Sequence, residues 1–163
     1  MIIQPELSSL NDPRIIIRKR LRTLEIMDGD QMIKSYPMVL GFSPIGYKEF
    51  EGDGKTPEGE FYVFTRNSES KFHLSLGISY PSLLDAERGL NVGVITADEF
   101  EDIKRAKDID AKPPQKTRLG GEIYIHGGGI GNDWTDGCVA LANKDIEEIF
   151  GVIPVGTKVS ILP

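Results

Sequence analysis

The sequence predicts a single-domain, mainly β fold with a few helices, and three observations lead to that expectation. The chain has 163 residues, which fits one domain and excludes a second globular domain. Eighteen glycines and ten prolines indicate many turns and therefore many short strands. Short apolar segments recur along the chain, whereas helical spacing is confined to a few stretches. We expect a sandwich or curled sheet within one domain over residues 1–163.

Short apolar segments between turns predict the strands. Residues 14–27 alternate imperfectly between apolar and polar side chains, and Asp28-Gly29 interrupts them before the next apolar segment, which is a hairpin pattern. The further expected strands are 31–36, 61–64, 72–80, 122–125 and 157–162.

Helices are predicted at two places. Thr96 followed by Glu99 is a capping box, and apolar residues recur three apart behind it, so we expect a helix over 97–109. Asn143 is the expected cap of a second, short helix that Gly151 ends.

The composition excludes several classes of function. Nineteen Lys and Arg against 25 Asp and Glu give a net charge of −6, the wrong sign for neutralising phosphates, so nucleic acid is not an expected partner. Basic residues between 14 and 22 are interleaved with apolar ones, and we expect them on the solvated side of strands. One cysteine excludes an internal disulfide, and with two histidines it makes a structural metal site unexpected.

No membrane or targeting segment is expected from the sequence. No apolar run approaches the roughly 20 residues that span a bilayer, so no transmembrane segment is predicted. The first 14 residues lack the cationic start and apolar stretch of a secretory signal, so no signal peptide is predicted in this chain. The protein is then either cytoplasmic or its export signal is absent from this sequence.

The chemistry is concentrated in residues 123–143, which contain the only cysteine and the only tryptophan. A thiol becomes a nucleophile when it loses its proton, and an imidazole within hydrogen-bond reach can accept that proton. Twelve positions separate His126 from Cys138, a distance that a glycine-rich loop can fold back across. Gly137 allows close approach of a substrate to backbone N–H groups. The spacing permits a nucleophile, a base and an oxyanion hole on one surface.

The same residues also have plain structural interpretations. A lone cysteine such as Cys138 is often an inert core residue, although the polar residues before it indicate an exposed loop. Asp133 and Asp136 are of a type common in turns, and Trp134 is expected to anchor its loop on the core. The triple glycine after His126 matches neither the dinucleotide nor the phosphate-loop motif.

Four segments together resemble one known family. They are GDGKTPEGEF at 52–61, SLGISYP at 75–81, IYIHG at 123–127 and WTDGCVAL at 134–141. In content and order they are similar to the L,D-transpeptidase catalytic domain, the YkuD-like family, and to its WTDGC branch. The resemblance extends over about residues 14–161 and implies a β-sandwich-like fold.

The resemblance implies a cysteine enzyme that acts on peptidoglycan stem peptides. Cys138 would acylate at the diaminopimelate carbonyl of a tetrapeptide, release the terminal D-alanine and pass the acyl group to an amine. His126 would be the base, the carbonyl of Gly127 would orient its imidazole, and N–H groups around Gly137 and Cys138 would form the oxyanion hole. The candidate substrate-pocket residues are Trp134, Thr135, Asp136 and Tyr80. No metal or organic cofactor is implied.

Three features depart from the usual family pattern. Asp136 stands where most members have histidine, and Ala140 stands where many have arginine or asparagine. The loop from His126 to Thr135 is also short. We expect these departures to alter specificity rather than to abolish activity.

Other functions stay open from the sequence. A hydrolase on the same fold, an L,D-carboxypeptidase or amidase, would use water in place of the amine. Either enzyme predicts an exposed Cys138 thiol of low pKa, whereas a noncatalytic wall-binding module predicts an unreactive one. Because peptidoglycan lies outside the cytoplasmic membrane, the expected location is the cell envelope, where an envelope protein is a candidate acyl acceptor.

Overall fold

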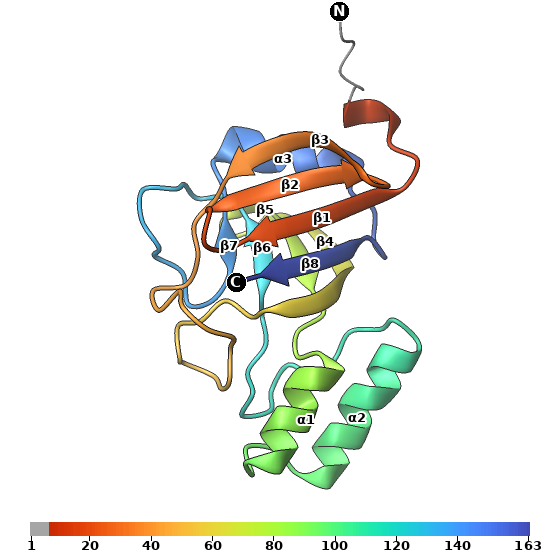
Figure 1. The fold of residues 1–163 in the computed structure, drawn as a ribbon, viewed down its shortest axis with the longest axis vertical. Coiled ribbons are helices and arrows are strands. Elements are labelled where there is room, and N and C mark those ends of the chain that lie inside the picture. The colour runs from red at the N-terminus through yellow and green to blue at the C-terminus, as the bar shows by residue number, and fades with distance from the viewer. Residues whose placement is uncertain (1–6) are drawn as a thin grey trace, which may run out of the picture.

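Eight strands form one sheet in the order β3-β2-β1-β8-β4-β5-β6-β7 within residues 7–163, the part of the chain that the computed structural model describes (Figure 1). The strands are β1 Pro13–Arg18, β2 Thr23–Asp28, β3 Gln31–Pro37, β4 Gly59–Ser70, β5 His73–Ile78, β6 Tyr124–His126, β7 Val139–Ala140 and β8 Lys158–Leu162. The helices are η1 Leu7–Ser9, α1 Leu83–Asn91, α2 Ala97–Asp108 and α3 Asn143–Val152. The predicted mainly β fold with a few helices is confirmed, while residues 1–6 of the predicted domain lie outside the described residues.

The long strand β4 divides the sheet into two facing halves. Residues 59–62 pair with β8, and the residues from Val63 onward pair with β5 through an irregular register. Beyond β3, Val39 exchanges two backbone hydrogen bonds with Ala140 of β7, at 2.9 and 3.0 Å. The sheet therefore curls until its two ends meet, which agrees with the expected sandwich-like arrangement.

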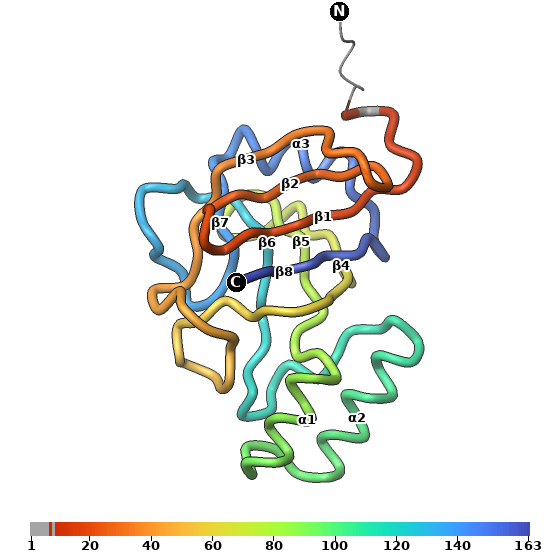
Figure 2. The backbone as a smooth tube through the Cα atoms, in the orientation of Figure 1, coloured from red at the N-terminus to blue at the C-terminus, as the bar shows by residue number. Residues whose placement is uncertain are grey.

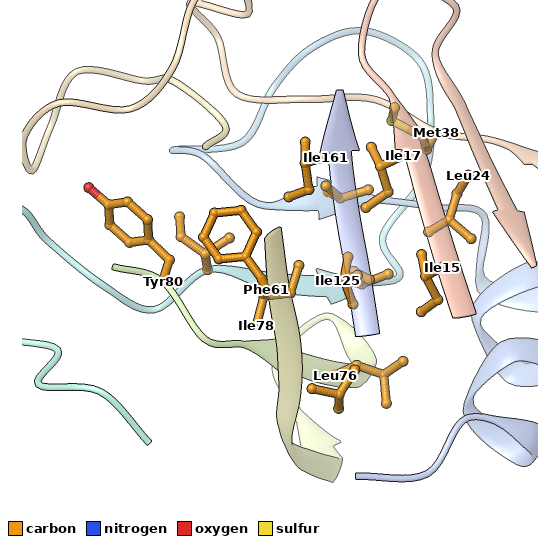
Figure 3. Packing of buried hydrophobic residues seen from close by; sticks show 14 of the residues in the cluster. Ile15, Ile17, Leu24, Met38, Phe61, Leu76, Ile78, Tyr80, Ile125 and Ile161 are labelled. Carbon is orange, nitrogen blue, oxygen red and sulfur yellow. The ribbon is translucent and has the colours of Figure 1, made fainter. Parts of the chain in front are cut away.

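Apolar side chains of the two halves fill the inside of the curl (Figure 3). Along β1 and β2 every second side chain is buried, because alternate residues of a strand point to opposite faces. Labelled members of this core are Ile15, Ile17, Leu24, Phe61, Leu76, Ile78, Ile125 and Ile161. Each such burial contributes about 1.5–3 kcal/mol, so this core holds β6 and β7 in place.

The predicted hairpin at Asp28-Gly29 is confirmed, because β2 and β3 pair antiparallel across it, but two details of the first strands differ from expectation. Residues 14–27 are two antiparallel strands, joined by a turn in which Arg22 adopts a positive φ of 53°. Lys19 in that turn is buried instead of solvated, with 3% of its surface exposed. Its Nζ donates to the carbonyls of Gly46 and Thr56 at 2.8 and 2.7 Å, so the loop after β3 satisfies the buried ammonium.

The helices differ in how they begin. The capping box of Thr96 and Glu99 is confirmed at the start of α2. Sequence analysis missed α1, which begins with a similar box between Ser82 and Asp85. The predicted cap of α3 is wrong, because Ala142 is the N-cap residue and the Asn143 side chain bonds to a neighbouring loop instead; the helix also continues through residue 151. The α1–α2 hairpin projects from one end of the sheet (Figure 2), and α3 packs beside β5 and β6.

Candidate active site

The parallel pair β6–β7 brings Cys138 and His126 to one cavity. Ile125 lies beside Val139 and His126 beside Ala140, so Cys138, just before β7, lies level with Tyr124, two residues before His126. Both side chains line a cavity of about 760 Å³. The predicted nucleophile and base therefore belong to one site.

His126 is held in a defined orientation and tautomer. Its ring is stacked on Phe72, with centroids 4.6 Å apart, and meets the Trp134 ring edge-on at 5.7 Å. Nδ1 lies 2.5 Å from the carbonyl oxygen of Gly127. Because a carbonyl only accepts, Nδ1 carries the proton and Nε2 is the basic nitrogen. Burial lowers the pKa of His126 more than the Gly127 hydrogen bond raises it, so the imidazole is neutral at neutral pH.

The loop that carries this carbonyl is closely packed. A Cβ at Gly127 would lie 2.5 Å from Asn143 Oδ1 and 2.9 Å from the Phe72 carbonyl oxygen, so the position accepts only glycine without movement. Asn143 Oδ1 also accepts from the backbone N–H of Gly128 at 2.9 Å. The start of α3 therefore fixes the residue that orients His126.

Cys138 is a half-buried, protonated thiol. Its Sγ accepts from the backbone N–H of Tyr124 and donates to the carbonyl of Glu122, both at 3.3 Å. Burial raises the pKa of Cys138 to about 11, and the charges of Asp136 and Glu122 add to that rise. The Tyr124 N–H and the charge of Lys48 act in the opposite direction. The expected exposed thiol of low pKa is therefore wrong for the resting site.

In the turn before Cys138, the backbone N–H of Gly137 is hydrogen-bonded within the turn itself. Gly137 has a φ of +146°, and a Cβ there would lie 2.8 Å from the Lys55 carbonyl oxygen, so the turn requires glycine. The Gly137 N–H donates to Thr135 Oγ1 at 3.1 Å, and this hydroxyl donates to the Cys138 carbonyl at 2.7 Å. In the resting structure the Gly137 N–H thus closes the turn and is not free to bind an oxyanion, contrary to expectation.

A family comparison agrees with this arrangement. Residues 12–161 match the model of the L,D-transpeptidase catalytic domain, YkuD. The chain belongs to the L,D-transpeptidase (YkuD) family. The match covers nearly all of the described residues, and both Cys138 and His126 lie within it.

Relatives of this L,D-transpeptidase domain include proteins provisionally named L,D-transpeptidases. YafK of Escherichia coli (strain K12) is 27% identical over 143 residues, which are 83% of this chain and 45% of YafK. YqjB of Bacillus subtilis (strain 168) is 28% identical over 155 residues, which are 92% of this chain and 71% of YqjB. The chain thus spans about half the length of YafK.

Solved structures share the fold of this domain. The helical cell shape determining protein Pgp2 of Campylobacter jejuni has a TM-score of 0.61 at 21% identity, covering 99% of this chain and 51% of Pgp2. L,D-transpeptidase 1 of Mycobacterium tuberculosis has a TM-score of 0.55 at 10% identity, covering 93% of this chain and 62% of that protein. At these identities the likeness is one of fold.

The other predicted pocket residues of the L,D-transpeptidase domain divide into two groups. Trp134, Thr135 and Asp136 line the cavity with Cys138. Tyr80 does not, because its ring is fully buried in the core and its hydroxyl donates to the Leu119 carbonyl at 2.7 Å. Its proposed place in the substrate pocket is therefore corrected.

Sequence analysis missed several residues of the site. Lys48 and Glu122 line the cavity, but no motif marks them, and only the closure of the loops brings them there. Asp133, expected as a turn former, accepts two hydrogen bonds from Arg22, at 3.1 and 2.8 Å, and one from the Leu40 N–H at 3.0 Å. The pairing with Arg22 lowers the pKa of Asp133 despite partial burial. Its distance of 111 positions from Arg22 hid this role in the sequence.

Within residues 7–163, no three His, Cys, Asp or Glu side chains are grouped to hold a metal ion. No helix in the described part of the chain has the length and apolar character of a membrane span.

Proposed function

We propose that the protein is a cysteine acyltransferase that cleaves the bond between diaminopimelate and terminal D-alanine in a stem tetrapeptide. The observation that carries this proposal is the shared cavity of Cys138 and His126, in which Gly127 holds the Nδ1 proton and leaves Nε2 as a base. Membership of the L,D-transpeptidase family supports peptidoglycan stem peptides as the substrate class.

The charge states support proton transfer during attack rather than before it. With a neutral thiol and a neutral imidazole, His126 Nε2 takes the Sγ proton while Sγ bonds to the carbonyl carbon of diaminopimelate. The imidazolium then gives this proton to the amine of D-alanine, the C–N bond breaks, and a thioester remains on Cys138. An acceptor amine attacks the thioester carbon and loses a proton to His126. The C–S bond then breaks, and the imidazolium returns the proton to Sγ, which restores the thiol.

The oxyanion of the intermediate needs a donor that is not used in the turn. Because the Gly137 N–H donates to Thr135, we assign this role to the backbone N–H of Cys138. The positive charge of Lys48, which already acts on the thiol, would favour the same negative charge.

The acceptor and the location belong to the same proposal. Since the substrate class lies outside the cytoplasmic membrane, we propose that the domain acts in the cell envelope. The acceptor is an amine of a second stem peptide, and a lysine of an envelope protein is another candidate. With water as acceptor the same site would be an L,D-carboxypeptidase.

Product analysis tests the proposal. The protein is incubated with disaccharide-tetrapeptide, with and without an amine acceptor, and the products are weighed by mass spectrometry. We expect D-alanine release and an amide to the acceptor, both lost in Cys138→Ala. A trimmed tripeptide alone, even at high amine concentration, would show a hydrolase. Binding without any product would favour the wall-binding module.

A further inference from the structure

Lys48 is a buried ammonium in the wall of the active-site cavity. Its side chain is 4% exposed, and it lines the same cavity as Cys138. Its Nζ donates to Asp53 Oδ1 at 2.7 Å and to the Phe50 carbonyl at 3.0 Å. Among the residues that the structure describes these are its two acceptors, whereas an ammonium has three N–H donors. One donor is therefore left for a ligand.

The pair with Asp53 fixes the ammonium in position. The Asp53 side chain is 3% exposed and also accepts the backbone N–H groups of Glu49, Phe50 and Lys55. Burial raises the pKa of Asp53, but the hydrogen bonds from Lys48 and from the backbone outweigh it and lower the pKa overall. The loop thus fixes the conformation of the Lys48 side chain, so binding of a ligand would not carry the entropy cost of ordering a flexible side chain.

Lys48 also lies next to the segment that contacts the reacting sulfur. A Cβ at Gly120 would lie 3.5 Å from Lys48 Cε, so the lysine stem packs against the backbone there. Two residues further on, the Glu122 carbonyl accepts from the Cys138 thiol. Lys48 therefore packs against the same wall segment that contacts the Cys138 thiol.

The charges of the cavity single out this lysine. The Lys, Asp and Glu residues in the lining are Lys48, Glu51, Lys71, Glu122 and Asp136. Lys71 stands over the Phe72 ring at 5.2 Å, whereas the charge of Lys48 acts on the Cys138 thiol. Three acidic side chains repel an anionic peptide unless a cation receives its carboxylate.

We infer that Lys48 binds a carboxylate of the donor peptide and thereby determines which stem peptides the site accepts. The inference rests on the proposed function. A tetrapeptide donor offers two carboxylates of the same chemistry, one on the side chain of diaminopimelate and one at the C-terminus. Either would make a charge-assisted hydrogen bond with the free N–H of Lys48.

A binding measurement tests this without turnover. Trp134 is the only tryptophan and lines the cavity, so its fluorescence reports occupancy. The Cys138→Ala protein is titrated with the tetrapeptide, with its diaminopimelate side-chain amide and with its C-terminal amide. We expect one amide to bind about 10- to 100-fold more weakly than the free acid, which identifies the carboxylate. Equal binding of all three peptides would overturn the inference.

Variants assign the selectivity to Lys48. In the Cys138→Ala background, Lys48→Met with Asp53→Asn removes the buried pair together, and the preference for the free acid should disappear. Lys55→Met is the matched control, since Lys55 belongs to the same loop, is 27% exposed and does not line the cavity. A preference for the free acid that survives in the double variant would contradict the role of Lys48. If the double variant does not fold, the titration of the Cys138→Ala protein with the two amides decides whether the site binds a carboxylate.

The two proposals fail separately. The protein could prefer the free acid in a way that depends on Lys48, while the Cys138-containing protein releases no D-alanine. That result would refute the proposed function and keep the carboxylate site. Equal rates of D-alanine release from the free acid and from the side-chain amide, and of D-alaninamide release from the C-terminal amide, would support the proposed function and refute the carboxylate site.

Discussion

Cys138 and His126 are both uncharged at neutral pH, because His126 is buried and the half-buried Cys138 thiol lies in a site that disfavours its charged form. Burial raises the pKa of the thiol to about 11 and lowers the pKa of the imidazole. A preformed thiolate–imidazolium pair is therefore not the resting state of this site. The neutral pair keeps the thiol unreactive until a bound carbonyl receives its electrons while His126 receives its proton.

The pH dependence of thiol alkylation follows from these charges. The thiolate fraction of Cys138 should grow about tenfold per pH unit between pH 7 and pH 10, because this range lies below its pKa. Iodoacetamide rates, followed by intact mass, should rise accordingly, and no other cysteine interferes. A rate that levels off below pH 8 would reveal a preformed thiolate.

The effect of the Asp136 charge on the pKa of Cys138 should be measurable through the alkylation rate of the same thiol. Asp136→Asn removes a carboxylate that raises the pKa of Cys138, so alkylation at pH 8 should become about two- to fivefold faster. Asp98→Asn, an exposed change in the first turn of α2, is the control and should leave the rate unchanged. Identical rates for all three proteins would show that Asp136 does not act on the thiol.

At the residue scale the sequence predicted which side chains share the cavity, Cys138 and His126, but not their protonation states. The assignments of Cys138, His126 and the Gly127 carbonyl follow from the resemblance to the family motif. The pKa directions depend on burial by side chains such as Phe72, which the sequence places 54 positions before His126. The carboxylate-binding role of Lys48 has no local pattern at all.

The loop between β6 and β7 is the element that fixes the orientation of the His126 imidazole. Its first residue, Gly127, provides the carbonyl that holds Nδ1 of His126 and packs against Asn143 of α3. Orientation of His126 is therefore coupled to the start of a helix that follows it by 17 positions.

A methyl group at Gly127 should disturb this coupling. Gly127→Ala must displace either the loop or Asn143, so we expect a loss of about 1–3 kcal/mol in unfolding free energy and a lower kcat. Gly131→Ala in the same loop is the matched control, because its Cβ meets no atom within 4 Å. Chemical denaturation and D-alanine release measure the two effects, and equal behaviour of both variants would contradict the coupling.

Elements with local signals were predicted best. The capping box marks α2, and the similar Ser82–Asp85 box could have marked α1, whose short length and internal glycine, Gly89, hid it. Residues 14–27 contain the tight turn at Arg22 without glycine or proline, so the division into β1 and β2 carried no turn signal. The cap of α3 was misassigned because Asn143 has a tertiary partner, Gly128.

Across the whole molecule, the turn between β1 and β2 joins the loops on both sides of the site. Lys19 binds the loop after β3, and Arg22 binds Asp133 ahead of the catalytic turn. The family motif predicted the overall sheet, whereas the meeting of Val39 with Ala140 depends on the curl of the complete sheet.

Loss of the Arg22–Asp133 pair should therefore affect activity as well as stability. Because the pair is partly exposed, Arg22→Ala should cost about 1 kcal/mol in unfolding free energy, with a severalfold lower kcat as the catalytic turn loosens. Arg20→Ala, an exposed change in the same turn, is the control. The unfolding free energy and the rate of D-alanine release are measured for both variants. Equal values in Arg22→Ala and Arg20→Ala would show that the turn does not position the site.

The measurement that tests the cysteine mechanism most directly is intact-mass spectrometry of protein quenched in acid during turnover of disaccharide-tetrapeptide. The wild-type chain should gain the mass of the donor minus D-alanine, on the peptide that contains Cys138. Cys138→Ala should show neither this adduct nor D-alanine release. Release of D-alanine by Cys138→Ala at the wild-type rate would contradict the assignment of Cys138 as the nucleophile.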